Sequence, residues 1–137
     1  MSEQENIAVV QQAYNNFKTG NIQALLDLLS PDVTWELPEM ENVPFAGKRQ
    51  GREEVGEFFA TLGASQETLR FEPTEFVAQR DKVVSLGNYE WRVRANARTF
   101  GSSFAFVFTI RDGSITGFQE FTDTAVAVKA YQKAMSA

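Results

Sequence analysis

The chain has 137 residues, of which 43% are hydrophobic and 23% charged, a composition typical of one soluble globular domain. Its net charge of −5 argues against nucleic acid or an anionic membrane surface as the main partner, because both bind basic faces. It contains no cysteine and no histidine, which excludes disulfides, Ser-His-Asp chemistry and Cys- or His-ligated metals and leaves acid–base work to carboxylates, tyrosines or lysines.

The N-terminal part of the chain predicts two helices. Ser2 and Glu5 form a capping-box pattern, and apolar residues at helical spacing follow it. An amphipathic helix is therefore expected over residues 3–18. Asn21 is a suitable N-cap for a second, shorter helix, which we expect to end at Ser30-Pro31.

The middle of the chain predicts a strand, a loop and a third helix. Residues 33–37 alternate apolar and polar side chains, which is typical of a half-buried strand. Prolines and a glycine within residues 38–50 indicate a loop. Acidic residues after Gly51 favour the first turn of a helix that begins there.

The second half changes from helical to alternating periodicity. Asp112-Gly113 is a strong hairpin signal, and Asp123 or Thr124 can cap a last helix. Four strands are expected, over residues 69–79, 82–97, 99–111 and 114–122. The order of these elements indicates a single α+β domain in which helices cover one face of a largely antiparallel sheet.

No segment predicts a membrane, phosphate or metal site. The polar N-terminus is unlike a signal peptide, and no apolar run reaches membrane-spanning length. Gly101 to Ser103 lies within a predicted strand and so lacks the following helix that a phosphate loop needs. We therefore expect a cytoplasmic protein without a cofactor.

Several short motifs share an order and spacing with one known family. They are Asp32–Pro38, Phe45–Gly47, Gly51–Val55, Val107–Ile115 and Glu120–Asp123. Over residues 1–137 the chain resembles the SnoaL-like branch of the nuclear-transport-factor-2-like superfamily, which includes ketosteroid isomerase. The resemblance implies a cone-shaped, strongly curved sheet packed on three to four helices around one apolar pocket. It also implies a homodimer formed through the outer face of the sheet.

The catalytic groups of the isomerases are only partly present. The isomerase base aligns with Leu37, which cannot accept a proton, and the adjacent Glu36 belongs to the opposite strand face. The buried acid aligns with Phe106 or Ala105. The resemblance leaves only Tyr14 as a counterpart of the helix-one tyrosine, so steroid isomerisation by the known mechanism is rejected.

Glu120 is the remaining candidate for a catalytic base. It shares a strand face with Phe118 and Thr122, and the resemblance implies that this face lines the pocket. A carboxylate in an apolar cavity has a raised pKa and is a competent base near neutral pH. The alternative is that Glu120 pairs with a cation or lies at the open rim. Tyr14 is either a hydrogen-bond donor to a ligand carbonyl or a core residue.

Aromatic side chains are expected to form the pocket wall. The chain has 12 phenylalanines, and Phe104, Phe106 and Phe108 share one strand face, which points inward or, with a one-residue change of register, outward. An aromatic pocket suits a flat hydrophobic ligand of polyketide, aromatic or terpenoid type. The predicted ligand-binding residues are Phe17, Trp35, Leu37, Phe58, Tyr89, Trp91, Phe106 and Phe118.

Three functions fit this pattern. The first is a cofactor-free enzyme of isomerase, cyclase or dehydratase type, with Glu120 as base and Tyr14 as donor. The second is a non-catalytic binder of a small hydrophobic molecule. The third is a dimeric scaffold whose cavity is filled by its own side chains.

Overall fold

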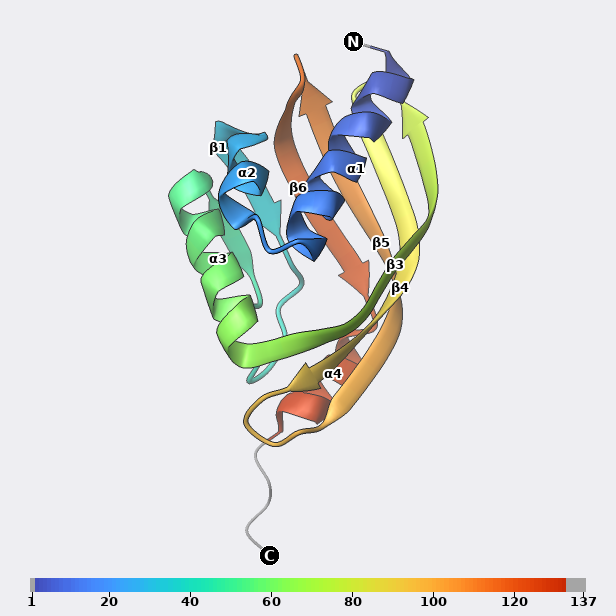
Figure 1. The fold of residues 1–137 in the computed structure, drawn as a ribbon. Helices are drawn as coiled ribbons and strands as arrows, with labels where there is room; N and C mark the ends of the chain where they lie inside the picture. Colours follow the sequence, from blue (N-terminus) through green and yellow to red (C-terminus); the bar gives the residue numbers. More distant parts are fainter. Residues whose placement is uncertain (1, 133–137) are drawn as a thin grey trace, which may run out of the picture.

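A computed structural model describes residues 2–132 as a curved, open six-stranded sheet with four helices (Figure 1). The strand order is β2-β1-β6-β5-β4-β3; β1 runs parallel to β6, and the other neighbouring strands are antiparallel. The helices are α1 (Glu3–Lys18), α2 (Ile22–Asp27), α3 (Arg52–Ser65) and α4 (Thr124–Tyr131). The strands are β1 (Leu29–Glu36), β2 (Lys48–Gln50), β3 (Gln66–Gln79), β4 (Lys82–Val93), β5 (Thr99–Arg111) and β6 (Ser114–Thr122).

Local signals set both ends of α1 and the start of α4 as the sequence predicts. The Ser2 hydroxyl accepts from the Glu5 amide, and the Glu5 carboxylate accepts from the Ser2 amide, so both halves of the capping box form. Gly20 follows α1 with a φ of 76°, a conformation that costs glycine little. Asp123 caps α4 by accepting from the Ala125 amide.

Several predicted boundaries are wrong. The first strand begins at Leu29 and not at residue 33, and the first long strand begins at Gln66 and not at residue 69. The second helix ends at Asp27, and Ser30-Pro31 belongs to β1. The strand tolerates Pro31 because its pairing with β6 is irregular between Leu29 and Thr34. The predicted loop contains β2, which is too short to show a period but pairs with the end of β1. The second long strand ends at Val93 because its chain turns back there, with the Val93 amide donating to the Arg98 carbonyl.

Close backbone contact at Gly87 and irregular pairing in β3 bend the sheet around a central space. A Cβ atom on Gly87 would lie 2.3 Å from the Glu72 carbonyl oxygen and 2.7 Å from the Phe104 ring, so only glycine fits. The β3–β4 register shifts twice, near Thr68 and Pro73, and such irregularities increase the bend. Figure 1 shows β3 to β6 curving behind α1, with α3 to one side and α4 across the lower end.

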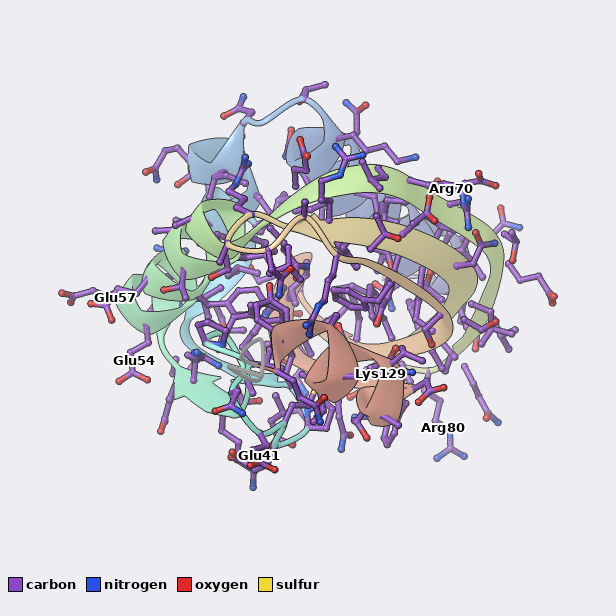
Figure 2. The ribbon with its side chains drawn as sticks, turned by 90° about the horizontal axis from the view of Figure 1, so that it is seen from below. Glu41, Glu54, Glu57, Arg70, Arg80 and Lys129 are labelled. Atoms are coloured by element: carbon purple, nitrogen blue, oxygen red, sulfur yellow. The ribbon has the colours of Figure 1, made fainter. Side chains whose placement is uncertain are left out.

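Alternation along the strands separates an aromatic inside from a polar outside. Phe104, Phe106 and Phe108 are all buried, which settles the register of β5 in favour of the inward orientation. Figure 2 shows side chains filling the space inside the curve, while Glu57 and Arg70 point away from it. Within residues 2–132, no helix combines the length and the apolar character needed to cross a membrane.

Candidate functional site

A cavity lies within the curve of the sheet, between its concave face and the helices. Its volume is about 90 Å³, whereas one water needs about 10–15 Å³. The lining comes from all four helices, from every strand except β2, and from the loop after β1. The cavity therefore has room for several waters or for a small organic ligand.

All ten residues that the sequence proposes for the site border this cavity. Their roles in binding and catalysis remain predictions. They are Tyr14, Phe17, Trp35, Leu37, Phe58, Tyr89, Trp91, Phe106, Phe118 and Glu120.

Stacked aromatic rings form one wall of the cavity. Trp35 and Phe118 are cross-strand neighbours on β1 and β6, and their ring centroids lie 4.0 Å apart. The Phe106 ring meets the edge of Phe118 at 5.1 Å. Rings on three adjacent strands thus hold one another in place beside the cavity.

Strand pairing places Glu120 among these rings. Ser85 on β4 lies opposite Phe106 on β5, and Phe106 lies opposite Glu120 on β6. Directly paired residues point to the same face of a sheet, so all three side chains are directed inward. The position of Glu120 in the cavity thus follows from the register of three strands.

The Glu120 carboxyl is unpaired within the part of the chain that the structure describes. Within residues 2–132 it takes part in no ion pair and no hydrogen bond, although the side chain is only half-buried because it borders the cavity. Desolvation raises the pKa of Glu120 to about 8. The alternative in which Glu120 pairs with a cation is not realised in this structure.

Tyr14 provides an unused hydrogen-bond donor beside this carboxyl. Its side chain is 8% exposed, and its hydroxyl has no hydrogen-bond partner within the described chain. Burial raises the pKa of Tyr14 above its ordinary value; the adjacent Ser85 hydroxyl lowers it, and the nearby charge of Glu120 raises it by a smaller amount. Tyr14 therefore remains protonated over the physiological range and is free to donate.

Two further donors differ in availability. The indole Nε1 of Trp35 is buried and unpartnered, like the Tyr14 hydroxyl. The Tyr89 hydroxyl forms a hydrogen bond with Thr122. Burial first, and the charge of Glu120 second, raise the pKa of Tyr89. Within residues 2–132, Tyr14 and Trp35 thus carry enclosed donors without a partner, whereas the Tyr89 hydroxyl is already engaged.

The loop after β1 closes one side of the cavity. One guanidinium nitrogen of Arg49 donates to the carbonyls of Phe45 and Ala46 at 2.7 Å and of Gly47 at 3.2 Å. The same guanidinium lies 5.3 Å from the centre of the Phe58 ring. Arg49 thereby fixes the loop that places Phe45 against the cavity.

Sequence reasoning missed two polar residues of the site region. Ser85 is 0% exposed and its hydroxyl has no hydrogen-bond partner in the described chain. Gln66 is 3% exposed, lines the cavity and accepts a 2.6 Å hydrogen bond from the Tyr131 hydroxyl. Neither belongs to a motif, so only strand pairing reveals them. Phe100 was also missed, although it continues the alternation of Phe104 and Phe106.

Within residues 2–132, no group of three or more carboxylates is arranged to hold a metal ion. The polar side chains that border the cavity are those of Tyr14, Trp35, Gln66, Tyr89, Trp91, Glu120 and Thr122. Together they form one ionisable acid and several hydrogen-bonding groups in an aromatic enclosure. This arrangement can orient a ligand oxygen and exchange a proton with the ligand.

Comparison with known proteins identifies the same architecture. Residues 10–118 match the SnoaL-like domain family. An NTF2-like protein from Burkholderia xenovorans is 30% identical, with a TM-score of 0.87 over 96% of this chain and 99% of its own. An NTF2-like protein from Burkholderia pseudomallei is 27% identical, with a TM-score of 0.87, and the match covers 97% of this chain and 100% of that protein. TerC, which was crystallised with polyporic acid, is 27% identical, with a TM-score of 0.82, and the match covers 94% of this chain and 99% of TerC. No curated protein matches the chain.

Proposed function

The chain belongs to the SnoaL-like domain family, and from this premise we propose that it binds a small, flat hydrophobic carbonyl compound in its cavity and catalyses cofactor-free proton transfer with Glu120 as the base. The observation that carries the proposal is the environment of that carboxyl. In the described chain it is a carboxyl without an ion pair or hydrogen bond, it lies among aromatic rings, and Tyr14 beside it carries an unpaired hydroxyl.

Proton transfer next to a carbonyl needs a base and a donor for the oxygen. Ionised Glu120 takes a proton from the carbon adjacent to the carbonyl, and the electron pair of that C–H bond moves to form an enolate. The Tyr14 hydroxyl donates to the enolate oxygen, where the negative charge gathers. Protonated Glu120 then returns the proton to the same carbon or to another carbon of the ligand.

The pKa of Glu120 suits this role in a defined pH range. With a pKa of about 8, roughly a tenth of the carboxyl is ionised at pH 7. A base with a higher pKa takes a proton more readily, and this gain offsets its smaller ionised fraction. Proton abstraction is therefore expected to strengthen as the pH rises toward 8.

A relative of similar fold supports a ligand of this kind. TerC was crystallised with polyporic acid. In this chain, Trp35, Phe106 and Phe118 offer a flat ligand extended ring surface. The proposal therefore names an aromatic or polyketide-like compound with at least one carbonyl group.

A non-catalytic binder is the second candidate. Glu120 is mostly protonated at neutral pH and in that form donates a hydrogen bond to a ligand oxygen without removing a proton. Binding that survives without any proton exchange on the ligand would favour this candidate.

The experiment is proton exchange of 2-tetralone in deuterated buffer, followed by proton NMR of its C1 position. The wild-type protein is expected to accelerate the exchange. Glu120→Gln is expected to lower the acceleration by about 10²-fold or more, because a positioned base contributes about 10²- to 10⁴-fold. Glu57→Gln makes the same chemical change on the exposed face of α3 (Figure 2) and serves as the control. Equal rates with and without protein would contradict the catalytic proposal.

The outer face of the sheet is the proposed dimer interface. Phe121 and Val77 are 51% and 54% exposed there. Val84 and Val107, which pair across β4 and β5, extend the apolar character between them. An apolar stripe of this kind supports association with a second copy of the chain.

A further inference from the structure

The cavity has polar groups at two separate ends. Glu120 belongs to the row of paired residues that contains Ser85 on β4, whereas Gln66 pairs with Val93, at the end of the same strand. Eight residues separate Ser85 from Val93, or about 26 Å of extended chain. Bending at Gly87 lets both rows border one cavity, so the cavity follows the long axis of the curved sheet.

Gln66 is held with its amide nitrogen free. Its carbonyl oxygen accepts a 2.6 Å hydrogen bond from the Tyr131 hydroxyl. The Tyr131 ring packs against Phe45 and Phe100, which also border the cavity. No hydrogen bond from the Gln66 side-chain nitrogen occurs within residues 2–132, and this nitrogen is not among the fully enclosed atoms without a partner. The Gln66 amide thus carries two N–H donors that form no hydrogen bond within the described chain, on a residue that borders the cavity.

A buried amide whose N–H donors are unpaired destabilises the folded protein, unless a ligand or a water molecule accepts a hydrogen bond from it. The Tyr14 hydroxyl, at the other end of the cavity, is also a buried donor without a partner in the described chain, but it is fully enclosed. Between the two ends the lining is mainly aromatic: the indole N–H of Trp91 lies there, and the Tyr89 hydroxyl is already bonded to Thr122. The arrangement is complementary to a molecule that is apolar in its middle and polar at its ends.

We propose that Gln66 is a second ligand anchor and that the substrate class is an elongated, flat aromatic molecule with an oxygen acceptor at each end. This inference rests on the proposed function, since it assumes that the cavity binds a ligand. One oxygen accepts from Tyr14 beside Glu120, where the proton is transferred. The other accepts from the Gln66 amide and fixes which carbon lies next to Glu120.

The test uses two matched probes, 2-acetylnaphthalene and 2,6-diacetylnaphthalene, whose affinities are measured by calorimetry at pH 6. Wild-type protein is expected to prefer the second probe. Gln66→Leu is expected to reduce the ratio of the two affinities by about 3- to 10-fold, the range for one neutral hydrogen bond. Comparing ratios removes the statistical and apolar advantages of the second acetyl group.

Two further variants keep the test decisive. Tyr131→Phe leaves the Gln66 donors in place but removes the bond that orients them, so the ratio is expected to fall partway. If Gln66→Leu does not fold, Tyr131→Phe alone tests whether the Gln66 amide affects the ratio of the two affinities. Gln12→Leu makes the same change at an exposed position of α1 and should leave the ratio unchanged.

The outcomes separate the two proposals. Binding of both probes with a ratio that neither Gln66→Leu nor Tyr131→Phe alters would overturn the second anchor and leave the proposed function standing. Failure of both probes to bind the wild-type protein would overturn the proposed function and this inference together. A ratio that falls only in the Gln66 and Tyr131 variants supports both.

Discussion

Glu120→Gln should stabilise the protein, and the gain should increase with pH. Burial raises the pKa of Glu120 to about 8 from a model-peptide value of 4.5, so the folded state disfavours the ionised carboxylate. The contribution of Glu120 to stability is fully present below pH 4.5 and is lost as the pH rises through 8. Glutamine has a similar shape and no charge, so it avoids this loss.

The magnitude follows from the difference between the two pKa values. Proton linkage gives a cost of ionisation of about 1 kcal/mol at pH 5 and about 5 kcal/mol at pH 9. Water that enters the cavity solvates the carboxylate and lowers the cost of ionisation. We therefore expect the free energy of unfolding of Glu120→Gln, relative to wild type, to increase by about 2–4 kcal/mol between pH 5 and pH 9. Any fixed cost of burying the amide cancels in that difference.

The assay is urea unfolding of both proteins from pH 5 to 9, followed by tryptophan fluorescence. Burial raises the pKa of Tyr14 and of Tyr89, so neither tyrosine ionises in this range. Glu57→Gln, at an exposed position, should show no comparable pH-dependent gain. An advantage of Glu120→Gln that stays constant within about 0.5 kcal/mol from pH 5 to 9 would refute the reasoning.

Three other predictions follow from the same site. In a pH profile, the rate of 2-tetralone exchange should rise about tenfold per pH unit below pH 8 and level off above it. A rate that falls with rising pH would instead assign Glu120 the role of an acid. Tyr14→Phe should slow that exchange by about 10- to 100-fold yet leave the melting temperature equal or higher, because the hydroxyl it removes is buried without a partner. Phe121→Lys should convert a dimer into a monomer in sedimentation velocity, and a wild-type monomer would contradict the proposed interface.

Much of the cavity was predictable because period-two alternation assigns each strand residue to a face. That rule groups Phe104, Phe106 and Phe108 on one face and Phe118, Glu120 and Thr122 on another without knowledge of which strands are neighbours. It does not say which face points inward. The family resemblance supplied that for Glu120, and only the structure settles it for Phe106.

The polar details of the site were not predictable, because they depend on contacts between distant segments. Gln66 and Tyr131 are 65 residues apart in sequence, and only the packing of α4 against the start of β3 brings them together. Ser85 gains its significance from the neighbouring Tyr14 on α1. Phe45 reaches the cavity from a loop that has no period, and Arg49 determines its position.

The most direct test of the account is a carbon-13 NMR titration of the Glu120 carboxyl in protein labelled at its glutamate side chains. The Glu120 resonance is the one that disappears in Glu120→Gln. The account predicts a neutral carboxylic acid at pH 6 that titrates with a midpoint of about 8. A midpoint near the ordinary glutamate value of about 4.3 would contradict the central claim that Glu120 is a desolvated, unpaired acid in the cavity.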